Sequence, residues 1–257
     1  MLLFRFKTMP FAIEIRDIRK NYKGAWAPAL DGFSFFVQQK QIVGLLGPNG
    51  AAKTTSISII CGLVSPDSGN AYIYGKDCHK EKEAIRYMIG LVPQQIALFG
   101  DLTATENYNY IGRLYGLEQK IIDKRVKGLL EILGLDKHAD KRIKAYSGGM
   151  KRRANIIASL LHEPELLILD EPTAGVDVQS RAMILEFMKA YRQQGKTILY
   201  TSHLMDEAEQ VCDEVVIIDE GKFITSGTPE SLIKNTAGSK RLEDVFLHYT
   251  GRTVRDF

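Results

Sequence analysis

The sequence has few cysteines and lacks a long hydrophobic run, and each absence excludes a class of protein. Its three cysteines, Cys61, Cys78 and Cys212, form no Cys-x-x-Cys pair. A disulfide framework or a structural zinc site is therefore not expected, and a reducing compartment fits. No apolar run approaches the ~18–20 residues that a membrane span requires, and the opening segment is too short and interrupted for a signal peptide. We expect a soluble chain that starts at Met1 or Met9.

An excess of charge of one sign is also missing. Lys and Arg number 34 against 31 Asp and Glu, for a net charge of +3, so we expect no broad electrostatic surface for nucleic acid. The 257 residues are 45% hydrophobic and 25% charged, an ordinary globular mixture that excludes general disorder. Such a chain can bury a sizeable core, as one large domain or two small ones.

Apolar patterning predicts strands early, helices in the middle and an alternation of both later. Early strands are expected over 12–18, 33–37, 42–46, 70–74 and 89–92, with a helix over 53–61. Middle helices are expected from a Thr103-x-x-Glu106 capping box to Tyr115 and over 122–133. Later strands are expected over 166–169, 197–200 and 215–218, with helices over 179–193, 205–212 and 242–249. The alternation predicts a parallel sheet covered by helices.

A glycine-rich turn between a strand and a helix is the first candidate site. It reads Gly47-Pro48-Asn49-Gly50-Ala51-Ala52-Lys53-Thr54-Thr55. Glycines let the backbone turn so that its N–H groups face phosphate oxygens. Lys53 would then reach the β- and γ-phosphates, and Thr54 would bind Mg²⁺. The turn resembles a P-loop with one departure, because Ala52 stands where the pattern has glycine.

Two interpretations of Ala52 are open. If the position requires a positive φ, alanine costs about 1–2 kcal/mol there, and its methyl group could crowd the phosphates. Nucleotide binding or turnover would then be weakened. If the position is already helical, alanine is a good helix former and the change is mild.

A pair of carboxylates ends a buried strand and forms the second candidate site. The apolar run Leu166–Leu169 continues directly into Asp170 and Glu171. Ligands of open α/β sheets bind at the carboxyl ends of strands. Successive side chains of a strand point in opposite directions, so the two acids need different roles. Asp170 suits Mg²⁺, and Glu171 suits the polarisation of a water that attacks a γ-phosphate.

A third motif, Tyr146-Ser147-Gly148-Gly149-Met150, precedes an apolar helix. A hydroxyl and two glycine N–H groups at a helix N-terminus make a second anion site. Because one nucleotide needs only one such cradle, a second suggests that two chains share nucleotides head to tail. Alone, the motif could equally be an ordinary helix cap. The cations that come next, Lys151-Arg152-Arg153, are expected to form a solvated helix face.

Together these motifs resemble the nucleotide-binding subunit of an ABC transporter, over roughly residues 13–233. Tyr146 and Met150 replace the outer residues of that family's Leu-Ser-Gly-Gly-Gln signature, whereas Ser147-Gly148-Gly149 is retained. The resemblance implies an α/β fold with a P-loop NTPase core, a mainly parallel sheet, an antiparallel β edge subdomain and a helical signature lobe. The implied boundaries are an ABC ATPase domain over 10–235, with a core lobe over about 10–93 and 163–235, a helical lobe over about 94–162 and a short C-terminal extension over 236–257.

The resemblance also implies roles for four further residues. Tyr22 would stack on adenine, Gln94 would touch Mg²⁺ and the membrane partner, Asp177 would cross a dimer interface, and His203 would contact the γ-phosphate. Each match is weak alone: Tyr22 could be an ordinary aromatic, His203 could be structural, Asp177 could merely cap a helix, and the assignment of Gln94 could slip to Gln95. The resemblance is specific because these residues occur in the family's order along the chain.

The function implied is an ATP-hydrolysing subunit, with ATP and Mg²⁺ as cofactors, that powers export through separate transmembrane permease subunits. It would sit at the inner face of the cell membrane as a homodimer, or as a heterodimer with a second ATP-binding subunit, without nucleic acid. Export is favoured because Ser147–Arg153 and Leu242–Phe246 resemble the branch of drug, antibiotic, ion and polysaccharide exporters. The segment from Gln95 to about Tyr115 would dock the permease, or would simply form the core of the helical lobe. Two alternatives remain open: a non-transport ABC ATPase acting on DNA or ribosomes, and a regulator that binds nucleotide but hydrolyses it poorly.

Overall fold

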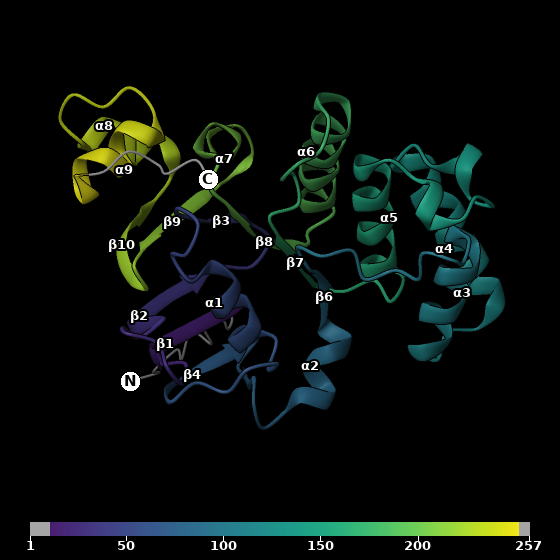
Figure 1. Ribbon diagram of the computed structural model, residues 1–257, viewed down its shortest axis with the longest axis horizontal. Helices are drawn as coiled ribbons and strands as arrows, with labels where there is room; N and C mark the ends of the chain where they lie inside the picture. The colour runs from purple at the N-terminus through teal and green to yellow at the C-terminus, as the bar shows by residue number, and fades with distance from the viewer. Residues whose placement is uncertain (1–10, 252–257) are drawn as a thin grey trace, which may run out of the picture.

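The computed structural model describes residues 11–251, and their helices and strands surround two β-sheets (Figure 1). Both candidate starting methionines and the end of the expected C-terminal extension, residues 252–257, lie outside the described residues. The first sheet has four antiparallel strands in the order β2-β1-β4-β5. These strands are β1 (Ile13–Lys20), β2 (Leu30–Val37), β4 (Ser68–Ile73) and β5 (Lys76–Asp77).

The second sheet has six strands in the order β10-β9-β3-β8-β7-β6. Its strands are β3 (Ile42–Leu46), β6 (Ile89–Val92), β7 (Leu166–Asp170), β8 (Thr197–Ser202), β9 (Glu214–Asp219) and β10 (Lys222–Gly227). Only the β9–β10 pair is antiparallel within this sheet. The predicted α/β class is thus confirmed, with a mainly parallel sheet beside an antiparallel one.

Nine α-helices occur within the described residues and pack around the sheets. They are α1 (Lys53–Ile60), α2 (Lys82–Met88), α3 (Ala104–Leu114), α4 (Gln119–Ile132), α5 (Gly148–Leu160), α6 (Val178–Gln193), α7 (Met205–Val211), α8 (Pro229–Asn235) and α9 (Leu242–Thr250). Helices α3, α4 and α5 gather at one end of the long axis, away from the antiparallel sheet (Figure 1). Short 3₁₀ turns at Asp136–His138 and Ile143–Ala145 join α4 to α5.

Two hydrophobic cores lie on opposite faces of the parallel sheet, and strand β7 supplies both. Its Leu167 and Leu169 pack with α3 to α6, whereas Leu166 and Ile168 pack with α1 and the antiparallel sheet. Because alternate side chains point to opposite faces, a strand covered on both sides must be apolar throughout. The uninterrupted apolar run before Asp170 is therefore the sequence signal of a central strand.

Two helices were missed by the sequence patterning, α2 and α8. Each buries one side chain, Ile85 in α2 and Leu232 in α8, so neither has an apolar stripe to reveal it. A cap signal was nevertheless present for α8, because Thr228 accepts a hydrogen bond from the Ser231 N–H and Pro229 stands at the first helical position.

The expectation of a solvated cationic face on α5 is wrong. Arg152 and Arg153 are only 6% and 9% exposed. Arg153 donates to the carbonyl of Leu133 at 2.6 Å, at the end of α4, and Arg152 reaches the loop after β6. Long side chains can bury their stems and carry the charge to backbone carbonyls, which charge patterning alone does not reveal.

Candidate functional site

Strand order brings three of the sequence-predicted features, the P-loop, the two acids and His203, to one edge of the parallel sheet. Strand β8 lies between β3 and β7, with Leu46 paired to Ser202 and Asp170 paired to Thr201. The loop after β3, the two acids ending β7 and His203 after β8 therefore emerge together. This edge is where ligands bind in open parallel sheets.

The loop after β3 folds back around Lys53, the first residue of α1. The Lys53 ammonium donates to the carbonyls of Gly47 at 2.8 Å and Pro48 at 3.0 Å. A Cβ on Gly47 would lie 2.2 Å from the carbonyl oxygen of Ile218 on β9, so only glycine fits there. Gly50 has φ +82°, a left-handed conformation that glycine adopts without strain.

Ala52 is left-handed as well, with φ 76° and ψ 23°, and it is the N-cap of α1. The interpretation that this position is already helical is therefore wrong, and the position has the positive φ of the strained alternative. The first turn of α1 fixes the conformation, because the Ala52 carbonyl accepts from both the backbone N–H and the hydroxyl of Ser56 at 3.0 Å. A residue with a Cβ costs about 1–2 kcal/mol in this conformation.

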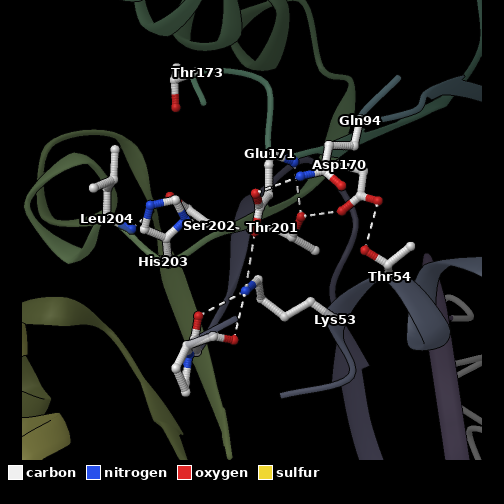
Figure 2. Close-up of polar contacts among 12 residues, drawn as sticks. Lys53, Thr54, Gln94, Asp170, Glu171, Thr173, Thr201, Ser202, His203 and Leu204 are labelled. Atoms are coloured by element: carbon white, nitrogen blue, oxygen red, sulfur yellow. Dashed lines mark hydrogen bonds and ion pairs between the residues drawn. The ribbon is translucent and has the colours of Figure 1, made fainter. Parts of the chain in front are cut away.

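A buried ion pair joins the loop to the carboxylate strand. Lys53 is 5% exposed, and its ammonium lies 3.2 Å from Glu171 Oε1 (Figure 2). Burial lowers the pKa of Lys53, and the negative charge of Glu171 opposes that shift. A buried charge is stabilised only by partners that replace its water, and here these are Glu171 and the two carbonyls.

Glu171 is the centre of the polar cluster in Figure 2. Its Oε2 accepts from the Gln94 amide at 3.1 Å, and its Oε1 lies 3.7 Å from His203 Nδ1. Its backbone has φ 47°, and its N–H donates to the hydroxyl of Thr201 at 3.0 Å. A non-glycine residue in this region indicates strain that the surroundings maintain. Gln94, rather than Gln95, carries the amide that reaches the carboxylate.

Asp170 faces different partners from its neighbour. Its Oδ2 accepts from the Thr54 hydroxyl at 3.0 Å, and its Oδ1 accepts from the Thr201 hydroxyl at 2.7 Å (Figure 2). Sequence reasoning missed Thr201, whose hydroxyl donates to the Asp170 carboxylate and accepts from the Glu171 backbone N–H. Its signal was its place on β8, two residues before His203, on the strand next to the carboxylates.

A cavity of about 290 Å³ opens beside these groups. Its lining residues are Ala29, Asn49, Gly50, Ala52, Lys53, Thr54, Thr55, Gln94 and Glu171. Tyr22 does not line it: the ring is 43% exposed, with the Lys20 ammonium 5.7 Å from its centroid. A larger cavity of about 540 Å³ between α4 and α6 is mostly apolar and contains none of the predicted site residues, so size alone does not identify the site.

The third motif lies outside the cavity of about 290 Å³, at the start of α5. Ser147 caps the helix, its hydroxyl accepting from the Met150 N–H at 3.3 Å. A Cβ on Gly149 would lie 2.1 Å from Ser180 Oγ and 2.5 Å from Asp177 Oδ2, whereas one on Gly148 would meet the described chain no closer than 3.8 Å. Packing within the chain thus explains Gly149 but not Gly148.

Asp177 caps α6 and lies next to Gly149 of the third motif. Its Oδ1 accepts from the Ser180 N–H and its Oδ2 from the Ser180 hydroxyl, each at 2.8 Å. The hydrogen bond from the Ser180 backbone lowers the pKa of Asp177, because it favours the ionised form. The cap and the start of α5 therefore form one surface.

Comparison with known proteins decides the family. The ABC transporter family profile matches residues 30–174. The chain belongs to the ABC transporter family. It is 46% identical to the linearmycin resistance ATP-binding protein LnrL of Bacillus subtilis, over 88% of this chain and 72% of that protein. It is 41% identical to a Nod factor export ATP-binding protein I of Ralstonia nicotianae, over 90% and 71%.

Solved structures show the same fold. An ATP-binding subunit of an ABC transporter superposes with a TM-score of 0.84 and 29% identity, over 93% of this ABC chain and 99% of that one. Among residues 11–251, the structure contains no helix with both the length and the apolar content needed to cross a bilayer.

Proposed function

We propose that this ABC family chain binds ATP with Mg²⁺, hydrolyses it, and powers export through a separate membrane permease. One observation carries the proposal: a lysine, a threonine, a glutamine and a glutamate line one cavity at the carboxyl edge of the sheet. Backbone N–H groups and a lysine suit the phosphates. A carboxylate and an amide beside them suit the attacking water.

Glu171 acts as the general base, and phosphate binding frees it for that role. Its Oε1 is held by the ammonium of Lys53 at 3.2 Å. Phosphate oxygens compete for the same ammonium, and as they bind they release the carboxylate toward water. Gln94 and His203, on either side of Glu171, then orient the water and the γ-phosphate. Catalysis comes mainly from positioning and electrostatics.

The residues present fit Mg²⁺. Thr54, Asp170 and Gln94 offer oxygen atoms, which this cation prefers, and the first two already share a hydrogen bond of 3.0 Å. No group of three His, Cys, Asp or Glu side chains among residues 11–251 could hold a metal by itself. That agrees with an ion which retains waters and phosphate oxygens among its ligands. When bound, Mg²⁺ neutralises charge on the β- and γ-phosphates.

Two copies of the chain form the complete site. We assign Ser147, Gly148, Gly149 and Met150 to the ATP held by the partner copy, and Asp177 to the interface between copies. Support comes from Gly148, because a Cβ there would meet no atom of the described residues closer than 3.8 Å. A two-fold axis places each motif of one copy against the P-loop of the other. Tyr22 stacks on the adenine beside that P-loop.

Export is inferred from the two relatives, whose names describe resistance and export. The permease docks on the segment from Gln95 to Tyr115, so the chain lies at the cytoplasmic face of the membrane. A groove of about 330 Å³ supports this, because Ala97, Ile111 and Tyr115 line it together with the exposed Leu63. Its lining is mainly apolar, as expected for a surface that receives a partner.

We also assign the core lobe to residues 10–93 and 163–235, the helical lobe to residues 94–162, and a C-terminal extension to residues 236–257. Within the described part of that extension, α9 buries Leu242, Val245 and Phe246 in the same core as α7.

ATP titration followed by calorimetry, and phosphate release over time, test the activity. The parent chain with Mg²⁺ is expected to bind and hydrolyse ATP, whereas Lys53→Ala is expected to do neither. Binding without hydrolysis by the parent would favour the second candidate function, a regulator that hydrolyses poorly. The left-handed Ala52 in the P-loop is the observation that favours this candidate. Co-purification with a multi-span membrane protein tests the export assignment.

A further inference from the structure

Arg152 is a buried cation to which the proposed function assigns no role. It lies on α5, five residues after the capping Ser147, and is 6% exposed. Its Nη1 donates to the Pro93 carbonyl at 2.9 Å, and its Nη2 donates to the Gln94 carbonyl at 2.8 Å. One planar guanidinium thus holds two successive carbonyls of the loop after β6, a geometry that lysine cannot reproduce.

A second side chain of α5 holds the same loop. Asn155 lies three residues after Arg152, on the same helix face, and its Oδ1 accepts from the Ala97 N–H at 3.1 Å. The helix therefore fixes the loop over residues 93–97 at three backbone groups. A displacement of α5 cannot leave this loop unchanged.

The loop in turn holds the carboxylate. The Gln94 amide donates to Glu171 Oε2 at 3.1 Å, and Glu171 Oε1 pairs with Lys53. The contacts form one path from α5 through Arg152 and Gln94 to Glu171. Burial lowers the pKa of Arg152, and the negative charges of Asp170 and Glu171 oppose that shift. The cation therefore also interacts electrostatically with the two carboxylates.

We propose that Arg152 is a positioning residue that transmits the position of α5 to Glu171 by way of Gln94. The inference rests on the proposed ATPase function. When the start of α5 meets the nucleotide of the other copy, the guanidinium carries the helix displacement to the Gln94 backbone. The amide of Gln94 then re-aims the carboxylate. Hydrolysis is thereby favoured only when both halves of the site are in place.

The test compares Arg152→Gln and Arg152→Lys with Lys151→Ala, a matched change at the neighbouring position of α5. Misplacing a catalytic group by about 1 Å costs on the order of 10²-fold in rate. Arg152→Gln is therefore expected to lower kcat for ATP about 10- to 100-fold, with ATP affinity from calorimetry unchanged. The kcat of Arg152→Lys is expected to lie between those of the parent and Arg152→Gln, and the kcat of Lys151→Ala is expected to match that of the parent.

A double-mutant cycle with Gln94→Ala separates positioning from a merely structural role. Residues on one path give non-additive effects, so adding Arg152→Gln to Gln94→Ala is expected to change kcat little further. Multiplied losses, or a folded Arg152→Gln chain with the parent's kcat, would overturn the inference. If Arg152→Gln does not fold, Arg152→Lys enters the same cycle with the same two outcomes. A parent chain without ATPase activity would instead contradict the proposed function.

Discussion

The P-loop and the start of α5, the two proposed anion sites, differ in how many partners their side chains have within residues 11–251. Around the P-loop, Lys53 has both carbonyl and carboxylate partners, and Asp170 has partners on both oxygens. At the start of α5, Ser147 and Gly148 are exposed, and no contact among residues 11–251 explains why position 148 is glycine. The polar side chains of the first region therefore contact one another, whereas the second region is the one that we propose a partner copy completes.

The largest predicted effect comes from a change at Glu171, in the centre of the first region. Glu171→Gln keeps the side-chain shape but removes the proposed general base, so kcat is expected to fall about 10²- to 10⁴-fold while ATP still binds. Phosphate release and calorimetry measure the two quantities. Loss of binding together with kcat would mean that Glu171 serves the cradle rather than the water.

The next prediction sets the two signature glycines against each other. Gly149→Ala forces a Cβ against Asp177 and Ser180, and is expected to lower the free energy of unfolding by about 1–3 kcal/mol, as other overpacked sites do. Gly148→Ala has room and is expected to keep the parent's unfolding midpoint in urea while losing ATPase activity. Equal stability of the two variants, or full activity of Gly148→Ala, would remove the contrast.

A smaller effect, a gain in stability, is expected from a change at Ala52, where the backbone of the first region is strained. Ala52→Gly removes the Cβ from a left-handed residue with φ 76°, so the free energy of unfolding should rise by about 1–2 kcal/mol. ATP affinity should rise with it, since the methyl group lines the cavity. Urea unfolding and ATP titration check both. An Ala52→Gly chain no more stable than the parent would show that the neighbouring loop relaxes to accept alanine.

The smallest effect concerns His162, which follows the C-terminal end of α5 and contacts the first residue of β6. Its ring stacks on Tyr115 at 3.9 Å, and its Nε2 donates to the Ile89 carbonyl at 2.8 Å. Burial lowers the pKa of His162 below its usual 6.5, so below about pH 6.5 the unfolded chain binds more protons than the folded one. Stability should therefore fall as pH drops from 7.5 to 5.5, by at most about 1.4 kcal/mol per pH unit from this group.

His162→Phe, which keeps a flat ring without a titrating nitrogen, is the control for that pH dependence. Its unfolding midpoint should depend less on pH than that of the parent. An identical pH dependence in both chains would assign the effect to other groups.

Strands and motifs could be predicted from sequence because each leaves a local signal. The apolar run before Asp170 and the Thr103–Glu106 capping box are examples, and α3 does begin at that box, with the Glu106 N–H bonded to Thr103 Oγ1 at 3.1 Å. Long-range contacts leave no such signal. The burial of Arg152 depends on carbonyls about 60 positions away, and charge patterning therefore assigned it to solvent.

Ala52 shows the same limit at the site itself. Sequence identified the departure from the P-loop pattern, but the left-handed backbone that makes it costly is fixed by the hydrogen bonds from Ser56. The roles of Tyr22, Gln94, Asp177 and His203 stay predictions, although Gln94 and His203 do lie beside Glu171.

Mixing two inactive variants tests most directly whether each ATP is held jointly by two copies. Lys53→Ala removes the cradle of its own chain, and Ser147→Arg blocks the exposed end of α5. In a mixed pair, one of the two sites combines an intact Lys53 with an intact Ser147. An equal mixture should therefore recover roughly a quarter of the parent's ATPase activity, for random pairing about a two-fold axis. Two folded variants that stay inactive at every mixing ratio would contradict a site shared between copies.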